Sequence, residues 1–230
     1  MLAHRGASAG RPEQSLAGYR AAIQAGVDGV ECDVRVSLDG QPVCIHDRAV
    51  DRTTSGTGLV ATKRLDELQA LGVPSLRDVC AVVAAAGRPL ELAIETKHPS
   101  RHGGLVERAV ADVLAEFGWQ RPGGRVTVRG MSFSRLALLR MHRLAPELEL
   151  VRLMNRRWPP YLGVFPPGVR VIGVGVRILR GRPGMVRRLA RRGMRVHVWT
   201  VDDPADLPRC RELGADVVIT NRPEMLMARR

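Results

Sequence analysis

Side chains that can do acid–base, metal and anion chemistry recur at the ends of the apolar runs of this 230-residue sequence. They are His4, Arg5, Glu31, Asp33, His46, Glu95 and Lys97. The three carboxylates offer hard oxygen ligands, which suit Mg²⁺ or Ca²⁺ rather than a soft metal. The two imidazoles can act as general acid and base, and the two cations can bind an anion. If these groups converge, they form a site suited to metal-assisted cleavage of a phosphodiester.

Residues 30–47 predict a β-hairpin that gathers part of this set. Asp39-Gly40 lies between two alternating runs, which is typical of a two-residue type I′ turn. Such a loop places Asp33 opposite His46, with Glu31 on the same face two residues earlier. The opposite face is aliphatic and consists of Val34, Val36, Val43 and Ile45, in the pairs 34–45 and 36–43.

Strand-like apolar runs alternate with helical periodicity along the chain. The runs cover residues 2–7, 30–38, 41–47, 90–97, 125–131, 148–153, 169–176, 195–201 and 216–220. Helices are expected from 11–15 up to Gly26 and over 75–86, 105–117, 134–144, 184–192 and 204–213. This alternation predicts an α/β fold with a mainly parallel sheet, and the length suits a (β/α)₈ barrel. Nine runs compete for eight places, and a tight antiparallel hairpin conflicts with an all-parallel barrel.

The composition indicates a single globular domain over residues 1–230, with 45% hydrophobic and 26% charged residues. No apolar run approaches the ~20 residues that span a bilayer. The first residues lack the basic and apolar regions of a signal peptide. The four cysteines have no metal-type spacing and sit in apolar contexts. We therefore expect buried free thiols and a cytoplasmic location.

The net charge of +13 is unevenly distributed. Residues 1–100 carry 11 basic and 12 acidic side chains, whereas residues 101–230 carry 25 and 11. Residues 151–195 contain twelve arginines and no acid. The spacing in 184–192 predicts an inward face of Val186, Leu189 and Ala190 and an outward face of Arg187, Arg188, Arg191 and Arg192. This stretch is either a solvated basic face or a surface that contacts anions, such as an anionic membrane.

Motifs spread over nearly the whole chain resemble, in the same order, those of the glycerophosphodiester phosphodiesterases. They are His4-Arg5-Gly6, Pro12-Glu13, Glu31-x-Asp33-Val34, Asp39-Gly40, Val43-x-x-His46-Asp47, Asp51-Arg52-Thr53-Thr54-x-Gly56-x-Gly58, Glu95-x-Lys97, Ser132-Phe133, Trp199-Thr200-Val201 and Ile219-Thr220-Asn221-Arg222-Pro223. The first motif alone would mean little, but the set as a whole is specific.

The resemblance implies an irregular TIM barrel of the phospholipase-C-like phosphodiesterase type. It implies hydrolysis of a glycerophosphodiester, a small-molecule substrate, to an alcohol and sn-glycerol 3-phosphate. The implied roles are a divalent metal, Mg²⁺ or Ca²⁺, on Glu31, Asp33 and Glu95, and acid–base catalysis by His4 and His46. Further implied roles are phosphate contacts from Arg5 and Lys97, an orienting role for Glu13, and packing of Trp199 on the glycerol.

The sequence departs from the family pattern at a few positions. Gln14 and Ser15 stand where the family usually has Asn and Thr, so no contacts are carried over to them. Asn221 stands where Asp is common, which removes one negative charge near the expected barrel mouth. The first strand, which carries His4 and Arg5, is very short, or its true start lies upstream.

Two other functions compete with this hypothesis. One is a phosphodiesterase that acts on lysophospholipids at a membrane surface, motivated by the basic stretch 151–195. Against it, the 184–192 helix is short and lacks a large apolar face for insertion. The other is a non-catalytic barrel that binds polyanions. An aromatic fraction of 3% is too low for base-stacking platforms, so we expect no nucleic-acid partner.

Overall fold

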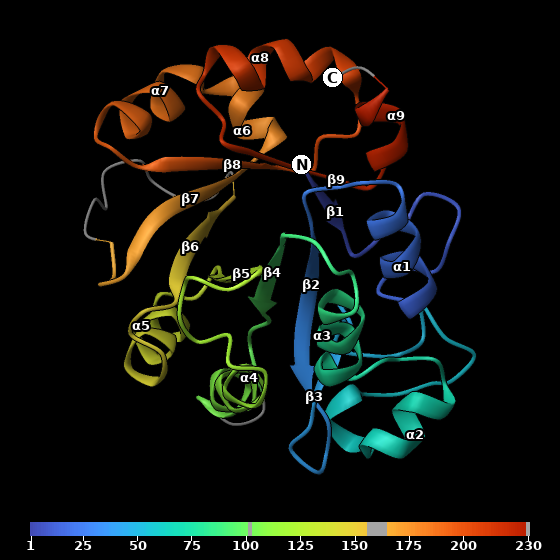
Figure 1. Cartoon of the computed structure of the whole chain (residues 1–230). Coiled ribbons are helices and arrows are strands. Elements are labelled where there is room, and N and C mark those ends of the chain that lie inside the picture. The colour runs from blue at the N-terminus through green and yellow to red at the C-terminus, as the bar shows by residue number, and fades with distance from the viewer. Residues whose placement is uncertain (101–102, 156–164, 229–230) are drawn as a thin grey trace.

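The computed structural model describes residues 1–100, 103–155 and 165–228, so residues 156–164 of the basic stretch lie outside the described residues. Nine strands in this part of the chain form one sheet, and eight of them close into a parallel barrel (Figure 1). The barrel strands are β1 (Leu2–His4), β2 (Gly29–Val36), β4 (Leu90–Thr96), β5 (Val126–Ser132), β6 (Glu149–Met154), β7 (Val169–Gly175), β8 (Arg195–Trp199) and β9 (Val217–Thr220). The short β1 closes the barrel by pairing with both β2 and β9.

The ninth strand resolves the conflict in the sequence prediction. It is β3 (Pro42–Cys44), which pairs antiparallel with β2 and lies outside the ring of eight. The predicted register of this hairpin was wrong, because the observed pairs are 34–44 and 36–42. The backbone N–H of Ser37 donates to the carbonyl of Gln41, which leaves a three-residue loop. Of the loop residues only Gly40 has a left-handed φ, +80°, whereas a type I′ turn needs two.

The corrected register divides the apolar residues of the hairpin between two clusters. Cys44, rather than Ile45, lies beside Val34 in the main core. Val43 and Ile45 instead pack with Leu68 in a small separate core. That core supports the segment between β3 and the helix α3 (Leu76–Ala84), which contains η1 (Val60–Thr62) and α2 (Leu65–Ala70). The chain that leaves β3 carries His46 directly into this segment.

Helices surround the barrel (Figure 1). They are α1 (Leu16–Gln24), α3 (Leu76–Ala84), α4 (Leu105–Glu116), α5 (Arg135–Leu144), α6 (Val176–Gly181), α7 (Pro183–Arg191), η2 (Pro204–Asp206), α8 (Leu207–Glu212) and α9 (Pro223–Met227). The predicted stop of α1 at Gly26 is close, but its predicted start was wrong. Ser15 accepts a hydrogen bond from the Gly18 N–H and caps the helix there, so Pro12 lies in the preceding loop. The helices α2, α6 and α9 were not predicted.

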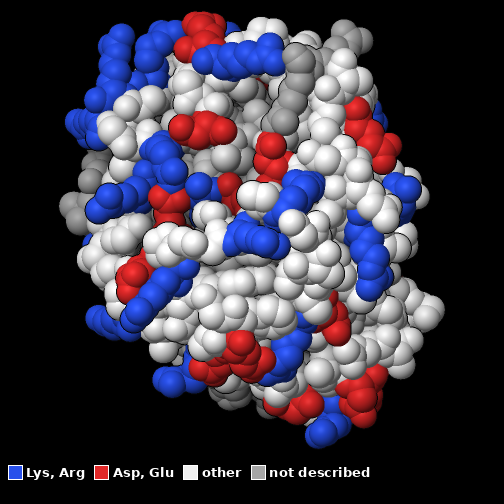
Figure 2. All heavy atoms as spheres, viewed as in Figure 1, with Lys and Arg blue, Asp and Glu red and all other residues white. Residues whose placement is uncertain are grey.

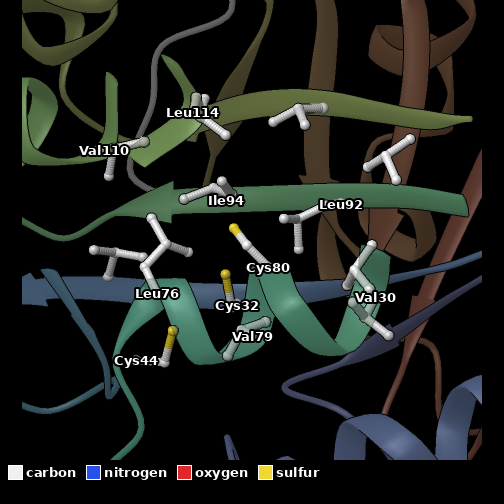
Figure 3. Close-up of a cluster of buried hydrophobic side chains, with 14 of the residues drawn as sticks. Val30, Cys32, Cys44, Leu76, Val79, Cys80, Leu92, Ile94, Val110 and Leu114 are labelled. Atoms are coloured by element: carbon white, nitrogen blue, oxygen red, sulfur yellow. The ribbon is translucent and has the colours of Figure 1, made fainter. Parts of the chain in front are cut away.

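The main core lies between the barrel wall and its helices. Val30 and Cys32 of β2 and Leu92 and Ile94 of β4 are fully buried, and Figure 3 shows them beside α3. Because strand side chains alternate, the residues between them point into the barrel. All four cysteines are free and buried, as predicted. The dry outer face of β2 thus fixes the inward direction of its carboxylates.

The helix α7 faces solvent with its arginines, as predicted. Val186 and Leu189 are buried and Ala190 is half-buried, while the four arginines of the segment are exposed. The acid-free stretch is not acid-free in space, because Glu212 of α8 pairs with Arg187 at 2.8 Å. Figure 2 shows acidic atoms among the basic ones over the region that Figure 1 labels α7 and α8. Within the described residues, no helix has both the length and the apolar character needed to cross a bilayer.

Candidate active site

Three carboxylates meet inside the barrel at the C-terminal end of β2 and β4. Glu31 and Asp33 alternate inward on β2, and Glu95 of β4 lies beside Asp33 in the parallel register. One oxygen from each carboxylate lies within 4.8 Å of the others, and all three residues are buried. Three buried carboxylates this close together would strongly disfavour folding if no positive charge lay beside them.

The electrostatics of this cluster fit a divalent cation. Burial, and then repulsion from Asp33 and Glu95, raise the pKa of Glu31 well above its usual range. Burial and repulsion from Asp33 likewise raise the pKa of Glu95 to about 7. Burial would also raise the pKa of Asp33, but Lys97 and Arg5 outweigh it and hold that pKa low. All-oxygen donors with an excess of negative charge are what Mg²⁺ or Ca²⁺ requires, so these residues can hold one.

Arg5 and Lys97 flank the acids with fixed positive charge. The Lys97 ammonium lies 2.8 Å from Glu95 Oε1 and 3.2 Å from Asp33 Oδ1. Arg5 Nε lies 2.8 Å from Asp33 Oδ2, and the Arg5 backbone N–H donates to Glu31 Oε2 at 3.1 Å. Burial would lower the pKa of Lys97, but Glu95 and Asp33 outweigh it and raise that pKa. Both cations therefore stay charged where an anion would dock.

His4 is held by a chain of polar groups from β9 and the loop after β8. Its Nδ1 lies 2.7 Å from Asn221 Oδ1. The Asn221 amide donates to Asp202 Oδ2 at 2.7 Å, so Oδ1 is the atom that faces the ring. His4 Nδ1 therefore carries the proton, and Nε2, 3.9 Å from Glu31 Oε2, faces the carboxylates. Burial, and then Arg5, lower the pKa of His4, which leaves this imidazole neutral at pH 7.

His46 is held by the segment that follows β3. Its Nδ1 lies 2.7 Å from Asp47 Oδ1, so Nε2 is the nitrogen left for the cavity. Arg52 donates to Asp47 Oδ2 at 2.5 Å, and this hydrogen bond is the main reason why the pKa of Asp47 falls to about 2. Burial lowers the pKa of His46 despite the opposing charge of Asp33. The two histidines thus each have one anchored and one available nitrogen.

A cavity of about 260 Å³ opens over the carboxylates. Seven of the predicted site residues line it, namely His4, Arg5, Glu31, His46, Glu95, Lys97 and Trp199. Asp33 lies behind them, against Arg5 and Lys97. Trp199 packs edge-on against Phe133, with ring centroids 5.6 Å apart. Among the described residues, no acceptor lies within hydrogen-bond distance of the Trp199 indole N–H. The cavity therefore has a polar floor and an aromatic wall.

Glu13 lies outside this cavity. Both of its oxygens accept hydrogen bonds from Arg5 at 3.2 Å, and Arg52 donates to the same carboxylate at 2.6 and 3.0 Å. Burial would raise the pKa of Glu13, but the hydrogen bond from Arg52 and the charge of Arg5 outweigh it and lower that pKa. Glu13 thus contacts Arg5 directly, and the orienting role that the resemblance implied for it stays a prediction.

Gln14 is a site residue to which the sequence assigned no role. It is buried, its amide donates to Asp33 Oδ2 at 2.8 Å, and its carbonyl accepts from the Tyr19 hydroxyl at 2.5 Å. Gln14 and Arg5 are the non-glycine residues with left-handed φ in the described chain, at 61° and 55°. Both residues contact Asp33, so the two strained positions support one carboxylate.

The comparisons with known proteins agree with this geometry. A model of the glycerophosphoryl diester phosphodiesterase family matches residues 4–225. A probable glycerophosphodiester phosphodiesterase 1 from Mycobacterium tuberculosis is 39% identical over 97% of this chain and 89% of its own. The chain belongs to the glycerophosphoryl diester phosphodiesterase family. It is therefore a phosphoric diester hydrolase that acts on glycerophosphodiesters.

Other relatives support the same family. A glycerophosphodiester phosphodiesterase from Bacillus subtilis is 28% identical over 97% of this chain and 84% of its own. A phosphodiesterase from Oleispira antarctica, solved with the product sn-glycerol-3-phosphate, has a TM-score of 0.86 and 26% identity. The match covers 99% of this chain and 94% of that one. The predicted family, barrel and enzyme class are confirmed.

Several polar residues around the phosphodiesterase site were not predicted as site residues. Asp202 was missed altogether, although it follows a barrel strand at the end where such sites form, which is the signal that could have found it. Asp47 and Arg52 were noted only as motif residues. Their role depends on how the segment after β3 folds back, which the sequence pattern did not reveal.

Proposed function

We propose that this phosphodiesterase binds its substrate phosphate over Glu31, Asp33 and Glu95, with Arg5 and Lys97 as its cationic partners. The convergence of three buried acids beside two cations is the observation that carries this proposal. A divalent cation held by the three carboxylates would act as a Lewis acid on the phosphoryl oxygens. Mg²⁺ and Ca²⁺ both suit an all-oxygen ligand set.

His4 and His46 act as the acid–base pair. Each presents one free ring nitrogen while its partner, Asn221 or Asp47, fixes the other. Both are neutral near pH 7, so one can accept a proton while the other, once protonated, donates one. The net reaction adds water across one P–O ester bond: oxygen goes to phosphorus and a proton to the departing alcohol. The products are an alcohol and sn-glycerol 3-phosphate, the compound bound in the Oleispira antarctica relative.

Trp199 forms the glycerol side of the site. Its ring and that of Phe133 form an apolar wall at the end of β8 and β5. The faces of these rings offer the CH groups of a glycerol an apolar surface on which to pack. In this proposal the glycerol lies at Trp199 and the phosphate at the carboxylates, so the alcohol lies on the side of Lys97.

The location and any membrane contact stay predictions of the sequence. Four free buried cysteines are consistent with a reducing, cytoplasmic environment. Pairing of Arg187 with Glu212 reduces the charge that α7 could offer to an anionic membrane. No observation favours lysophospholipids over soluble glycerophosphodiesters as substrates, so the soluble class is proposed.

Release of sn-glycerol 3-phosphate from glycerophosphocholine with added Mg²⁺ or Ca²⁺ tests this function. We expect His4→Ala and His46→Ala each to lower kcat by about 10²–10⁴-fold, because each removes a proton-transfer group. The melting temperature measured by circular dichroism should stay near that of the wild type. His142→Ala is the control, because this α5 histidine lies outside the cavity lining. Wild-type turnover by both site variants would refute the acid–base assignment.

A further inference from the structure

A second and larger cavity adjoins the phosphodiesterase site. Its volume is about 410 Å³, and it lies between the end of β2, the η1 segment and the start of α4. Lys97 lines both this cavity and the one that contains the carboxylates. The walls beyond Lys97 are largely aliphatic, with Val36, Val60 and Val106 among them. The phosphate and glycerol positions proposed above lie outside this cavity.

The rim of this cavity holds unusual exposed side chains. Leu38 and Leu59 are 52% and 46% exposed, and both line the cavity. Leu136 of α5, at 61%, is the other large apolar side chain left exposed in the described chain. A single exposed leucine needs no explanation. Two of the three line one groove, Leu38 from the β2–β3 loop and Leu59 from the position before η1, and this favours a ligand with apolar surface.

The groove lies on the alcohol side of the site. Trp199 ends β8 and Lys97 follows β4, and these strands are four places apart in a ring of eight. The two residues therefore stand on opposite sides of the barrel mouth. The two ester oxygens of a tetrahedral phosphorus point apart, so a substrate with glycerol at Trp199 directs its alcohol past Lys97. The groove begins there.

The charges beside the groove select against one kind of alcohol. Arg35, Arg48 and Lys97 all line it. Arg35 Nε donates to the His46 carbonyl at 2.9 Å, which holds its guanidinium in place. A quaternary ammonium group such as choline would enter next to these cations and be repelled, whereas a neutral apolar alcohol would not.

We propose that this groove binds the alcohol portion of the substrate, and that the enzyme prefers glycerophosphodiesters whose alcohol is neutral and carries an apolar chain. This inference rests on the proposed function and names the substrate class of the same site. Burying one CH₂ group stabilises a complex by ~0.8 kcal/mol, which is about fourfold in binding. A half-open groove should realise about twofold per methylene.

A series of sn-glycerol 3-phosphate esters of ethanol, butanol and hexanol, below their critical micelle concentrations, tests the chain-length claim. We expect kcat/KM of the metal-loaded wild type to rise about twofold per methylene, or roughly tenfold or more from ethyl to hexyl. Hydrolysis of every ester at one equal rate would overturn the groove assignment and leave the proposed function intact. No hydrolysis of any ester, nor of glycerophosphocholine, would refute the function itself.

Variants of the rim show whether the preference belongs to this groove. Leu38→Gln combined with Leu59→Gln keeps side-chain size and removes apolar surface. We expect it to flatten the chain-length series and leave the ethyl ester within about twofold of the wild type. Leu136→Gln, the matched control on α5, should keep the full slope. A slope that survives in the double variant would place the apolar contact elsewhere and overturn the proposal.

A pair of substrates matched in shape but not in charge tests the preference for a neutral alcohol. The 3,3-dimethylbutyl ester has the shape of the choline ester without its charge. We expect the wild type to prefer the neutral ester by about fivefold or more, and Arg48→Gln to reduce that ratio. Equal rates on the two esters by the wild type, or an unchanged ratio in the variant, would contradict the role of the cations.

Discussion

Asn221 and Asp202 together occupy the place of a single charged partner for His4. The resemblance put Asn221 at a position where Asp is expected, and in this chain the nearby carboxylate is that of Asp202, which contacts the Asn221 side chain. The Asn221 side chain connects His4 to the Asp202 carboxylate, because its N–H donates to Asp202 and its oxygen faces His4 Nδ1. A negative charge therefore lies behind His4 in this chain, although Asn221 itself is neutral.

This arrangement predicts the outcome of a reciprocal exchange. Asn221→Asp would set two carboxylates 2.7 Å apart, and Asp202→Asn would turn the Asn221 amide so that an N–H faces His4. Each single variant should lower kcat by about 10-fold or more, because the orientation of the imidazole is lost. The double variant restores one donor and one acceptor at each contact. We expect it to recover to within about threefold of the wild type, and purely additive losses would contradict the account.

Gln14 gives a second prediction at the scale of one residue. Its amide is one of the groups that fix Asp33, and groups that orient metal ligands typically matter about 10- to 100-fold for metal affinity. Gln14→Ala should therefore weaken Mg²⁺ or Ca²⁺ binding by that factor, measured by isothermal titration calorimetry. Tyr19→Phe, which removes only the hydroxyl behind Gln14, should have a smaller effect. Equal metal affinity in Gln14→Ala and the wild type would show that Asp33 needs no such support.

At the scale of elements, the sequence predicts most of the barrel. The ranges expected for β4 to β9 and for α3, α4 and α5 agree with the structure within a few residues. Periodicity works there because each strand buries its outer face against one helix. The carboxylates Glu31, Asp33 and Glu95 were found for the same reason, since alternation and parallel register decide where they point.

The elements that were predicted wrongly or missed depend on contacts that the hydrophobic pattern of the sequence does not report. The hairpin register was wrong because Asp39 accepts hydrogen bonds from Ser37 and Leu65 instead of taking a left-handed conformation. The short helices α2, α6 and α9 have too few residues for a periodic signal. The link between Arg52 and Glu13 joins two loops 39 residues apart in sequence, and only the fold brings them together.

Arg52 links two loops that hold Arg5 and His46, two residues of the proposed site, and this link can be tested by substitution. It binds Glu13 from the loop before α1 and Asp47 beside His46. Because Arg52 is half-exposed, its ion pairs are worth about 1 kcal/mol or less, so Arg52→Ala should lower kcat/KM by roughly fivefold. The control is Arg77→Ala, which breaks an equally short exposed pair with Glu116 away from the site. Identical kinetics for the two variants would show that the Arg52 links do not orient His46.

At the scale of the whole molecule, the barrel interior separates two charged layers. The three carboxylates of the candidate metal site lie at the C-terminal strand ends, and a second ionic cluster lies deeper, where Arg129 pairs with Glu91 and Glu149. His197 of β8 is 1% exposed next to this cluster. Burial, followed by the charges of Arg129 and Arg195, lowers the pKa of His197 to about 3. This imidazole is neutral in the folded protein.

Because His197 is buried in its neutral form, we expect the folded protein to lose stability in acid. The pKa of His197 in the folded protein lies below its value of about 6.5 in the unfolded chain. The contribution of His197 to the free energy of unfolding is therefore fully present above pH ~6.5 and is lost as the pH falls toward about 3. Between pH 7 and pH 5 the wild type should lose about 2 kcal/mol of unfolding free energy from this group. His197→Asn should lack that component in urea titrations at the two pH values. Parallel losses in both proteins would contradict the assignment.

The proposed reaction depends most on a divalent cation held among Glu31, Asp33 and Glu95. The most direct measurement is the release of sn-glycerol 3-phosphate by wild-type protein in excess chelator, followed by addition of Mg²⁺ or Ca²⁺ beyond the chelator. We predict no detectable turnover with chelator, recovery when a cation is restored, and no recovery for Glu95→Gln. Full turnover in excess chelator, or recovery by Glu95→Gln at the wild-type rate, would contradict the account.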